Sequence, residues 1–185
     1  MASALDDLLA RLADAERTPG GPPLDKWHPP LSGDIDIRIA ADGRWYHEGT
    51  VFQRLALVKL FSSILRREGD DYVLVTPVEK WRIQVDDLPF VAHSLARVER
   101  DGQALLLLTT NVGDELVIGE SHPLRVDVSA AGEPRPAVRV RANLWARVDR
   151  SSFYQLVEWA DSCTENGRTV LRVSSAGELF TLGSI

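Results

Sequence analysis

Seven polar side chains in two parts of the chain have the types and spacing to bind an anion. In the first part, Thr76, Glu79 and Lys80 place a hydroxyl, a carboxylate and an ammonium in a short connection that Pro77 interrupts. Binding residues are frequent in such loops on rigid scaffolds. The competing interpretation is a hairpin corner with a solvated Glu–Lys pair, which would contribute less than about 1 kcal/mol.

The second part begins with Asn111 and Asp114, which follow the apolar run 105–108. This position lets a turn offer an amide, a carboxylate and a backbone N–H at the end of a buried strand. The alternative is an Asx turn with Gly113 at positive φ.

His122 and Arg125 begin a further strand, and Arg139 and Arg141 alternate along the strand 137–142. Alternate residues of a strand point to the same face, so Arg139 and Arg141 would present two cations side by side. The alternative is a set of exposed residues on the wet face of an antiparallel sheet.

The sequence predicts no metal site, no cofactor and no catalytic residue. His28, His47, His93 and His122 are scattered without metal-ligand spacing, and the chain has one cysteine. The nucleophile elbow G-x-S-x-G, the phosphate loop and the dinucleotide fingerprint are absent from the sequence. We expect Cys163 to lie near the end of the second helix and to pack against other residues of the protein, without a role in thiol chemistry.

Composition restricts the classes of partner. The 185 residues carry a net charge of -6, which leaves no basic stripe for a nucleic acid polymer. The first 15 residues have no basic region and no long apolar run of a secretory signal, and no run is long enough to span a bilayer. We therefore expect a cytoplasmic protein without membrane insertion and with a small anionic or nucleotide-like ligand; the sequence identifies no protein partner.

The N-terminal region predicts a helix and a tether. Leucines spaced i, i+3, i+4 and i+7 indicate an amphipathic helix over 4–16 with Ser3 as its N-cap, and 18–23 reads as a Pro/Gly linker. The alternation of 35–39 then predicts a half-buried strand that ends at a hairpin turn, Ala41–Gly43.

Two capping patterns suggest an internal duplication. Thr50 with Gln53 predicts the start of a helix that runs to Arg67, and Ser152 with Gln155 predicts the start of a second helix. The remaining apolar and alternating segments predict strands at 72–76, 81–85, 91–98, 104–108, 115–118, 124–128, 137–142, 170–173 and 179–182.

These elements predict an α+β fold of two related strand-strand-helix-strand-strand halves with mostly antiparallel sheets, plus an N-terminal helix. The expected divisions are 1–22 for the helix and linker, 23–87 for the first half and 88–185 for the second. A duplicated architecture would place a ligand at the seam between the halves.

The segments Leu57–Arg67 and Tyr72–Lys80 closely resemble the bacterial family of domain of unknown function 1285, DUF1285. Thr110–Asp114 and His122–Arg125 also look like motifs of that family, and the resemblance extends from Asp34 to the C-terminus. It implies a duplicated α+β core whose second half is similar to pleckstrin-homology-like barrels. It also implies a nucleotide-type ligand between the halves and a signalling role.

The leading functional hypothesis is a non-enzymatic ligand-binding or signalling module. Its ligand would be neutralised by Lys80 and Arg125 and hydrogen-bonded by Asn111 and Thr76. Glu79 or Asp114 would orient the cations or accept a hydrogen bond from a ribose hydroxyl.

Two alternatives belong to other classes. In an enzyme, His122 with Glu79 or Asp114 would act as acid and base on a phosphorylated or acyl substrate. In a protein-interaction scaffold, a strand edge or the surface around Trp45 and Trp81 would bind a partner. Tryptophans on strands could also stack on a base, although they more often pack in a core.

Overall fold

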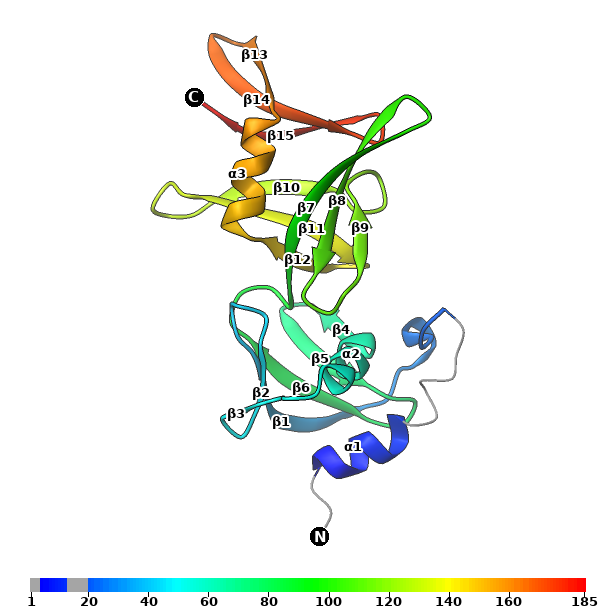
Figure 1. Cartoon of the computed structure of the whole chain (residues 1–185). Coiled ribbons are helices and arrows are strands. Elements are labelled where there is room, and N and C mark those ends of the chain that lie inside the picture. Colours follow the sequence, from blue (N-terminus) through cyan, green and yellow to red (C-terminus); the bar gives the residue numbers. More distant parts are fainter. Residues whose placement is uncertain (1–3, 13–19) are drawn as a thin grey trace. The chain divides into compact units, whose positions relative to one another are not determined.

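The computed structural model describes residues 4–12 and 20–185. The chain divides into two compact units, residues 1–87 and 88–185 (Figure 1).

The first unit is built on a six-stranded mixed sheet with strand order β3-β2-β1-β6-β5-β4. Its elements are α1 (Ala4–Leu12), the 3-10 turn η2 (Leu24–Lys26), β1 (Leu31–Ile39), β2 (Trp45–His47), β3 (Thr50–Val51), α2 (Leu55–Ser63), β4 (Leu65–Glu68), β5 (Asp71–Val75) and β6 (Lys80–Val85). The strands predicted at 35–39, 72–76 and 81–85 are confirmed. Neighbouring strands are antiparallel except β1 and β6, which are parallel.

The first predicted helix differs from the structure at both ends. Thr50 is in β3, where it pairs with His47 across a tight turn, so it does not cap a helix. The helix begins after Arg54, which makes no side-chain capping bond, and it ends at Ser63 because the chain enters β4 at Leu65. Pairing of β3 and β4 with their neighbours outweighs the local capping pattern.

Helix α2 covers one face of the sheet and forms the core of the first unit. Phe61 is fully buried and stacks on Trp45, with 6.2 Å between ring centroids. Ile37 and Ile39 on β1 are also fully buried on that face. Trp45 is therefore a core residue. A partner-binding surface or a base-stacking site would need this side chain to be exposed, so Trp45 contributes to neither.

The N-terminal helix α1 is confirmed over Ala4–Leu12. Leu8 and Leu12, one turn apart, are fully buried, so one side of α1 packs on the first unit. The expected N-cap Ser3, the helix extension over 13–16 and the start of the linker lie outside the described residues.

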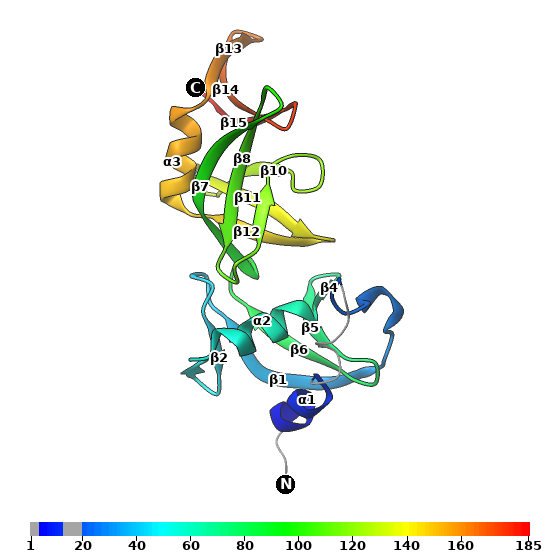
Figure 2. The same ribbon diagram turned by 45° about the vertical axis from the view of Figure 1, so that its right-hand side comes forward.

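The second unit contains a six-stranded sheet, a helix and a three-stranded sheet (Figures 1 and 2). Its elements are β7 (Phe90–Arg100), β8 (Gln103–Thr110), β9 (Glu115–Val117), β10 (Leu124–Val128), β11 (Pro134–Arg141), β12 (Leu144–Val148), α3 (Arg150–Glu158), β13 (Asp161–Glu165), β14 (Arg168–Ser175) and β15 (Glu178–Ser184). All the strands predicted for this half are present.

The two six-stranded sheets share one topology, which confirms the predicted duplicated α+β core. In each, two three-stranded antiparallel meanders join through a parallel pair of the first and last strands, β1 with β6 and β7 with β12. The halves differ in helix position: α2 lies between the two meanders, whereas α3 follows the second meander and precedes the third sheet. The likeness of the second half to pleckstrin-homology barrels stays a prediction.

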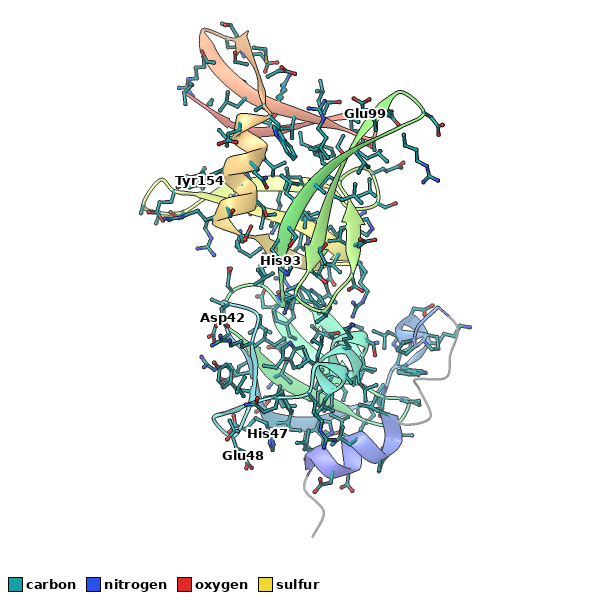
Figure 3. The ribbon with its side chains drawn as sticks, in the orientation of Figure 1. Asp42, His47, Glu48, His93, Glu99 and Tyr154 are labelled. Atoms are coloured by element: carbon teal, nitrogen blue, oxygen red, sulfur yellow. The ribbon has the colours of Figure 1, made fainter. Side chains whose placement is uncertain are left out.

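Helix α3 packs on β7 and β14 with Phe153 and Leu156 buried, while Tyr154 is exposed to solvent (Figure 3). Its N-cap is Asp149, whose side chain accepts a hydrogen bond from the Ser152 amide at 2.9 Å. The predicted cap, Ser152, is therefore the donor partner and lies inside the helix. The carboxylate at the N-terminus also interacts favourably with the helix dipole.

Candidate functional site

The Thr76–Glu79 segment is a tight turn that joins β5 to β6. The fully buried Thr76 donates its amide to the Glu79 carbonyl at 2.9 Å, and its Oγ1 accepts from the Glu79 amide at 3.1 Å. A hydroxyl that satisfies the turn in this way fixes the backbone. Thr76 thus shapes the loop, and its hydroxyl is already engaged.

Glu79 has an uncommon environment for a carboxylate. The residue is 9% exposed, and its Oε1 is buried without a hydrogen-bond partner in the described residues. Its ion-pair partner is Arg11 of α1, whose Nε lies 3.6 Å from Oε1. Glu79 therefore connects the N-terminal helix to the β5–β6 turn.

Lys80 belongs to a compact charge cluster with Glu68 and Arg66. The Lys80 Nζ donates to Glu68 Oε2 at 2.8 Å, and Arg66 donates to the other carboxylate oxygen. The hydrogen bond from Lys80, followed by that from Arg66, holds the pKa of Glu68 below its ordinary value although partial burial opposes the shift. An incoming anion would compete with Glu68 for the Lys80 ammonium.

The cluster also fixes the segment that precedes β1. Arg66 donates to the carbonyls of Leu24 and Trp27 at 2.8 and 2.7 Å. One guanidinium thereby joins the Glu68 carboxylate to two backbone acceptors, which gives this arginine a clear structural role.

Asn111 and Asp114 occupy the β8–β9 turn. The Asn111 Oδ1 accepts from the Val91 amide at 3.0 Å, and the Asn111 amide donates to the Val91 carbonyl at 2.8 Å. The Asp114 amide donates to Thr110 Oγ1 at 3.0 Å, and Asp114 is exposed to solvent. The Asn111 side chain thus attaches the turn to β7.

His122 and Arg139 fasten the loop before β10. The Nδ1 atom of His122 lies 2.9 Å from the Arg139 carbonyl, and the Arg139 guanidinium reaches the carbonyls of Glu120 and Ser121 at 3.3 Å. Because a carbonyl only accepts hydrogen bonds, Nδ1 carries a proton. His122 has no carboxylate partner among the residues that the structure describes.

Arg125 is held in a fixed orientation on the exposed side of β10. Its guanidinium lies 4.0 Å from the centre of the Trp145 ring, and its Nε lies 3.2 Å from Asp127 Oδ2. Neither contact uses the two terminal nitrogens, and these have no partner in the described part of the chain. Arg125 is a preorganised cation with free donors.

Arg125 is one of several arginines on the same face of the β10–β11–β12 meander. Cross-strand pairing aligns Arg125, Ala137 and Arg147 in one row, and it places Arg135 opposite Asp127 and Arg139 opposite Trp145. We call the residues Arg125, Arg135, Arg139, Arg147 and Trp145 the arginine face. Asp127 is the one carboxylate on this face of the three strands.

The predicted pairing of Arg139 with Arg141 on one face is wrong. The register shifts between them, so that Arg139 pairs with Trp145 and Arg141 pairs with Leu144. The bulge turns Arg141 to the opposite face, where its guanidinium lies 5.7 Å from the centre of the Phe90 ring. Burial there lowers the pKa of Arg141, against the opposing effect of Asp114.

The sequence-predicted residues therefore form separate local groups. Thr76, Glu79 and Lys80 belong to the first unit, whereas Asn111, Asp114, His122 and Arg125 belong to the second. A joint site of both groups stays a prediction. Sequence reasoning missed Trp145, Arg135 and Arg147, although period-2 alternation within β11 and β12 was a signal for them.

Cys163 is not at the end of a helix. It lies in the middle of β13, whose residues are all exposed, and is itself exposed. In residues 4–12 and 20–185, no group of three His, Cys, Asp or Glu side chains could hold a metal ion. None of the helices described in these ranges is both long and apolar enough to cross a membrane.

The duplicated sheets, the N-terminal helix and the arginine face define an α+β protein of two related halves. The DUF1285 N-terminal domain model matches residues 22–88, and the DUF1285 C-terminal domain model matches residues 89–182. Both are described as being of unknown function. The chain belongs to the DUF1285 family.

Two solved structures are similar to the chain. A DUF1285 family protein from Silicibacter pomeroyi DSS-3 is 43% identical, with a TM-score of 0.84, over 100% of this chain and 97% of that one. A DUF1285 family protein from Shewanella baltica OS155 is 28% identical, with a TM-score of 0.53, over 67% and 91%. No curated protein matches the sequence.

Proposed function

We propose that this DUF1285 protein is a non-enzymatic binding module for a small anionic or nucleotide-like molecule, which it holds on the arginine face of the second unit. The observation that carries the proposal is the orientation of Arg125. Trp145 supports the guanidinium and Asp127 engages Nε, so the terminal N–H groups have no partner among the described residues.

Charge supports the same assignment. The whole chain has a net charge of -6, yet the arginine face carries four arginines against the single carboxylate of Asp127. A planar guanidinium that is fixed before binding loses little side-chain entropy when it meets a phosphate or carboxylate. Bidentate, charge-assisted hydrogen bonds then provide both affinity and orientation.

His122 contacts the Arg139 carbonyl through Nδ1, so only Nε2 is left to meet a ligand. Thr76, Glu79 and Lys80 would join the site only if the ligand also reached the first unit.

The experiment is a thermal-shift screen against inorganic phosphate, pyrophosphate, nucleoside triphosphates, cyclic dinucleotides and sugar phosphates. A ligand at about 100 times its Kd adds roughly 2.7 kcal/mol to the stability of the folded state. We expect a selective rise in melting temperature that Arg125→Gln removes. Arg150→Gln, an exposed arginine at the start of α3, is the matched control.

Two outcomes would overturn the proposal. One is the absence of a shift with every anion tested. The other is an equal loss in Arg125→Gln and Arg150→Gln, because it would indicate general screening of charge and not a site on the arginine face.

A further inference from the structure

A small cavity lies in the second unit, away from the arginine face. Its volume is about 180 Å³, and it lies where the C-terminal end of α3 meets the β7–β8 pair and the three-stranded sheet. Figure 1 shows the chain passing from α3 into β13. The lining residues are Arg97, Ala104, Leu106, Trp159, Asp161, Val173 and Ser174.

Hydrogen bonds join the two sheets beside this cavity. The fully buried Ser175 accepts from the Leu106 amide at 2.9 Å and donates to the Ile118 carbonyl at 2.6 Å. The Ala176 amide donates to the Ala104 carbonyl at 3.0 Å. These bonds join β8 to the end of β14 beside the lining residues Ala104, Leu106 and Ser174.

Two exposed residues of opposite charge on different strands line the cavity. Arg97 comes from β7 and Asp161 from β13, and neither forms an ion pair with another residue that the structure describes. The last residues of α3 precede Asp161, so the negative end of the helix dipole adds to its carboxylate. One side of the cavity thus favours an ammonium group, and Arg97 favours a carboxylate.

The remaining lining sets the size and polarity of the ligand. Leu106 and Val173 are buried apolar residues, and the Trp159 side chain adds an aromatic surface that suits a cation or an alkyl chain. Drug-sized ligands usually bind in pockets of about 300–1,000 Å³. A cavity of about 180 Å³ lies below this range and has room for a single amino acid.

We propose that this cavity binds a free L-amino acid with a small to medium apolar side chain. Arg97 pairs with the α-carboxylate, Asp161 and the end of α3 hold the α-ammonium, and the side chain lies against Trp159 and Leu106. The site is independent of the arginine face, since it uses other strands and the zwitterion has no net charge.

The test is isothermal titration of the full chain with proteinogenic L-amino acids at up to about 10 mM, ten times a millimolar Kd. We expect binding of L-leucine or of another free L-amino acid with an apolar side chain of similar size. Arg97→Gln and Asp161→Asn should each weaken binding about tenfold or more, because each removes a charge-assisted hydrogen bond. Arg100→Gln and Glu178→Gln, exposed charges outside the lining, should leave the affinity unchanged.

Ligand analogues separate the zwitterion from simpler ligands. N-acetyl-leucine lacks the ammonium and leucinamide lacks the carboxylate, so both should bind at least about tenfold more weakly than leucine. The proposal fails if no amino acid binds in this range. It also fails if either analogue binds as well as leucine, or if Arg97→Gln and Asp161→Asn retain the affinity of the native chain.

Discussion

The Arg125 guanidinium lies 4.0 Å above the Trp145 ring although the two residues are on β10 and β12, with β11 between them. The β11 partner of Arg125 is Ala137, whose small side chain lets Arg125 extend across the middle strand. Trp145 pairs with Arg139, the next β11 residue on the same face, so the contact runs diagonally across β11. The contact fixes a cation on the sheet surface before any ligand arrives. Substitutions of Trp145 therefore test whether this preorganisation matters.

Replacing Trp145 with phenylalanine should weaken anion binding slightly, and replacing it with leucine should weaken it more. A cation–π contact at an exposed position contributes about 0.5–1 kcal/mol, which corresponds to a two- to fivefold change in Kd. Titration of pyrophosphate into the native chain and both variants measures the order. Equal affinity of all three proteins would show that the ring does not position Arg125 for binding.

The Glu68 cluster predicts a pH dependence of stability. The pKa of Glu68 is lowered from 4.5 in the folded chain, so its stabilising contribution is present above that value and is lost as the pH falls through the folded pKa. Glu68→Gln should therefore lower the free energy of unfolding near neutral pH, and the difference from the native chain should shrink as the pH falls below 4.5 and through the folded pKa.

Urea unfolding of the native and Glu68→Gln proteins at neutral and at acid pH measures the difference in their free energy of unfolding. Glu48→Gln, which replaces an exposed carboxylate of the same unit without an ion pair in the described residues, is the control and should show a smaller effect. A difference between native and Glu68→Gln proteins that stays constant with pH would contradict the assignment of the charge cluster.

Ser175 should be important for the stability of the second unit. Ser175→Ala removes the acceptor for the Leu106 amide and the donor for the Ile118 carbonyl, both at a fully buried position. A buried group left without its partner costs about 1–3 kcal/mol. Denaturant unfolding of Ser175→Ala should show this loss, whereas Ser174→Ala, at the exposed neighbour, should change stability by less than about 0.5 kcal/mol.

Many of the strands could be predicted because the alternation of apolar and polar residues is a property of the local sequence. Ile35, Ile37 and Ile39 indicate the position of β1 and its buried face, and the same pattern located β6. The continuous apolar run 72–75 located β5. The start of α2 could not be predicted from Thr50, because the partner that holds this residue in β3 is His47 across a turn. Strand pairing therefore decided what the capping pattern could not.

The candidate site was predictable only in part for a related reason. Arg125 was identified from sequence, but Trp145 lies two strands away, and the order β10-β11-β12 is needed to bring them together. The bulge that separates Arg139 from Arg141 also has no signature in the alternating sequence. The Thr76 hydroxyl and the Asn111 side-chain oxygen both accept hydrogen bonds from backbone amides of the protein. Residues that the sequence suggests as ligand contacts can therefore have a role in forming turns instead.

The most direct test of anion binding at the arginine face is an NMR titration of the full chain with inorganic pyrophosphate. The chain has five tryptophans, and the indole signal that Trp145→Phe removes identifies Trp145. We predict saturable shifts of the Trp145 indole N–H and of the Arg125 amide, and their loss in Arg125→Gln. Shifts that are confined to Thr76–Lys80, or that rise without saturation throughout the chain, would contradict the proposal.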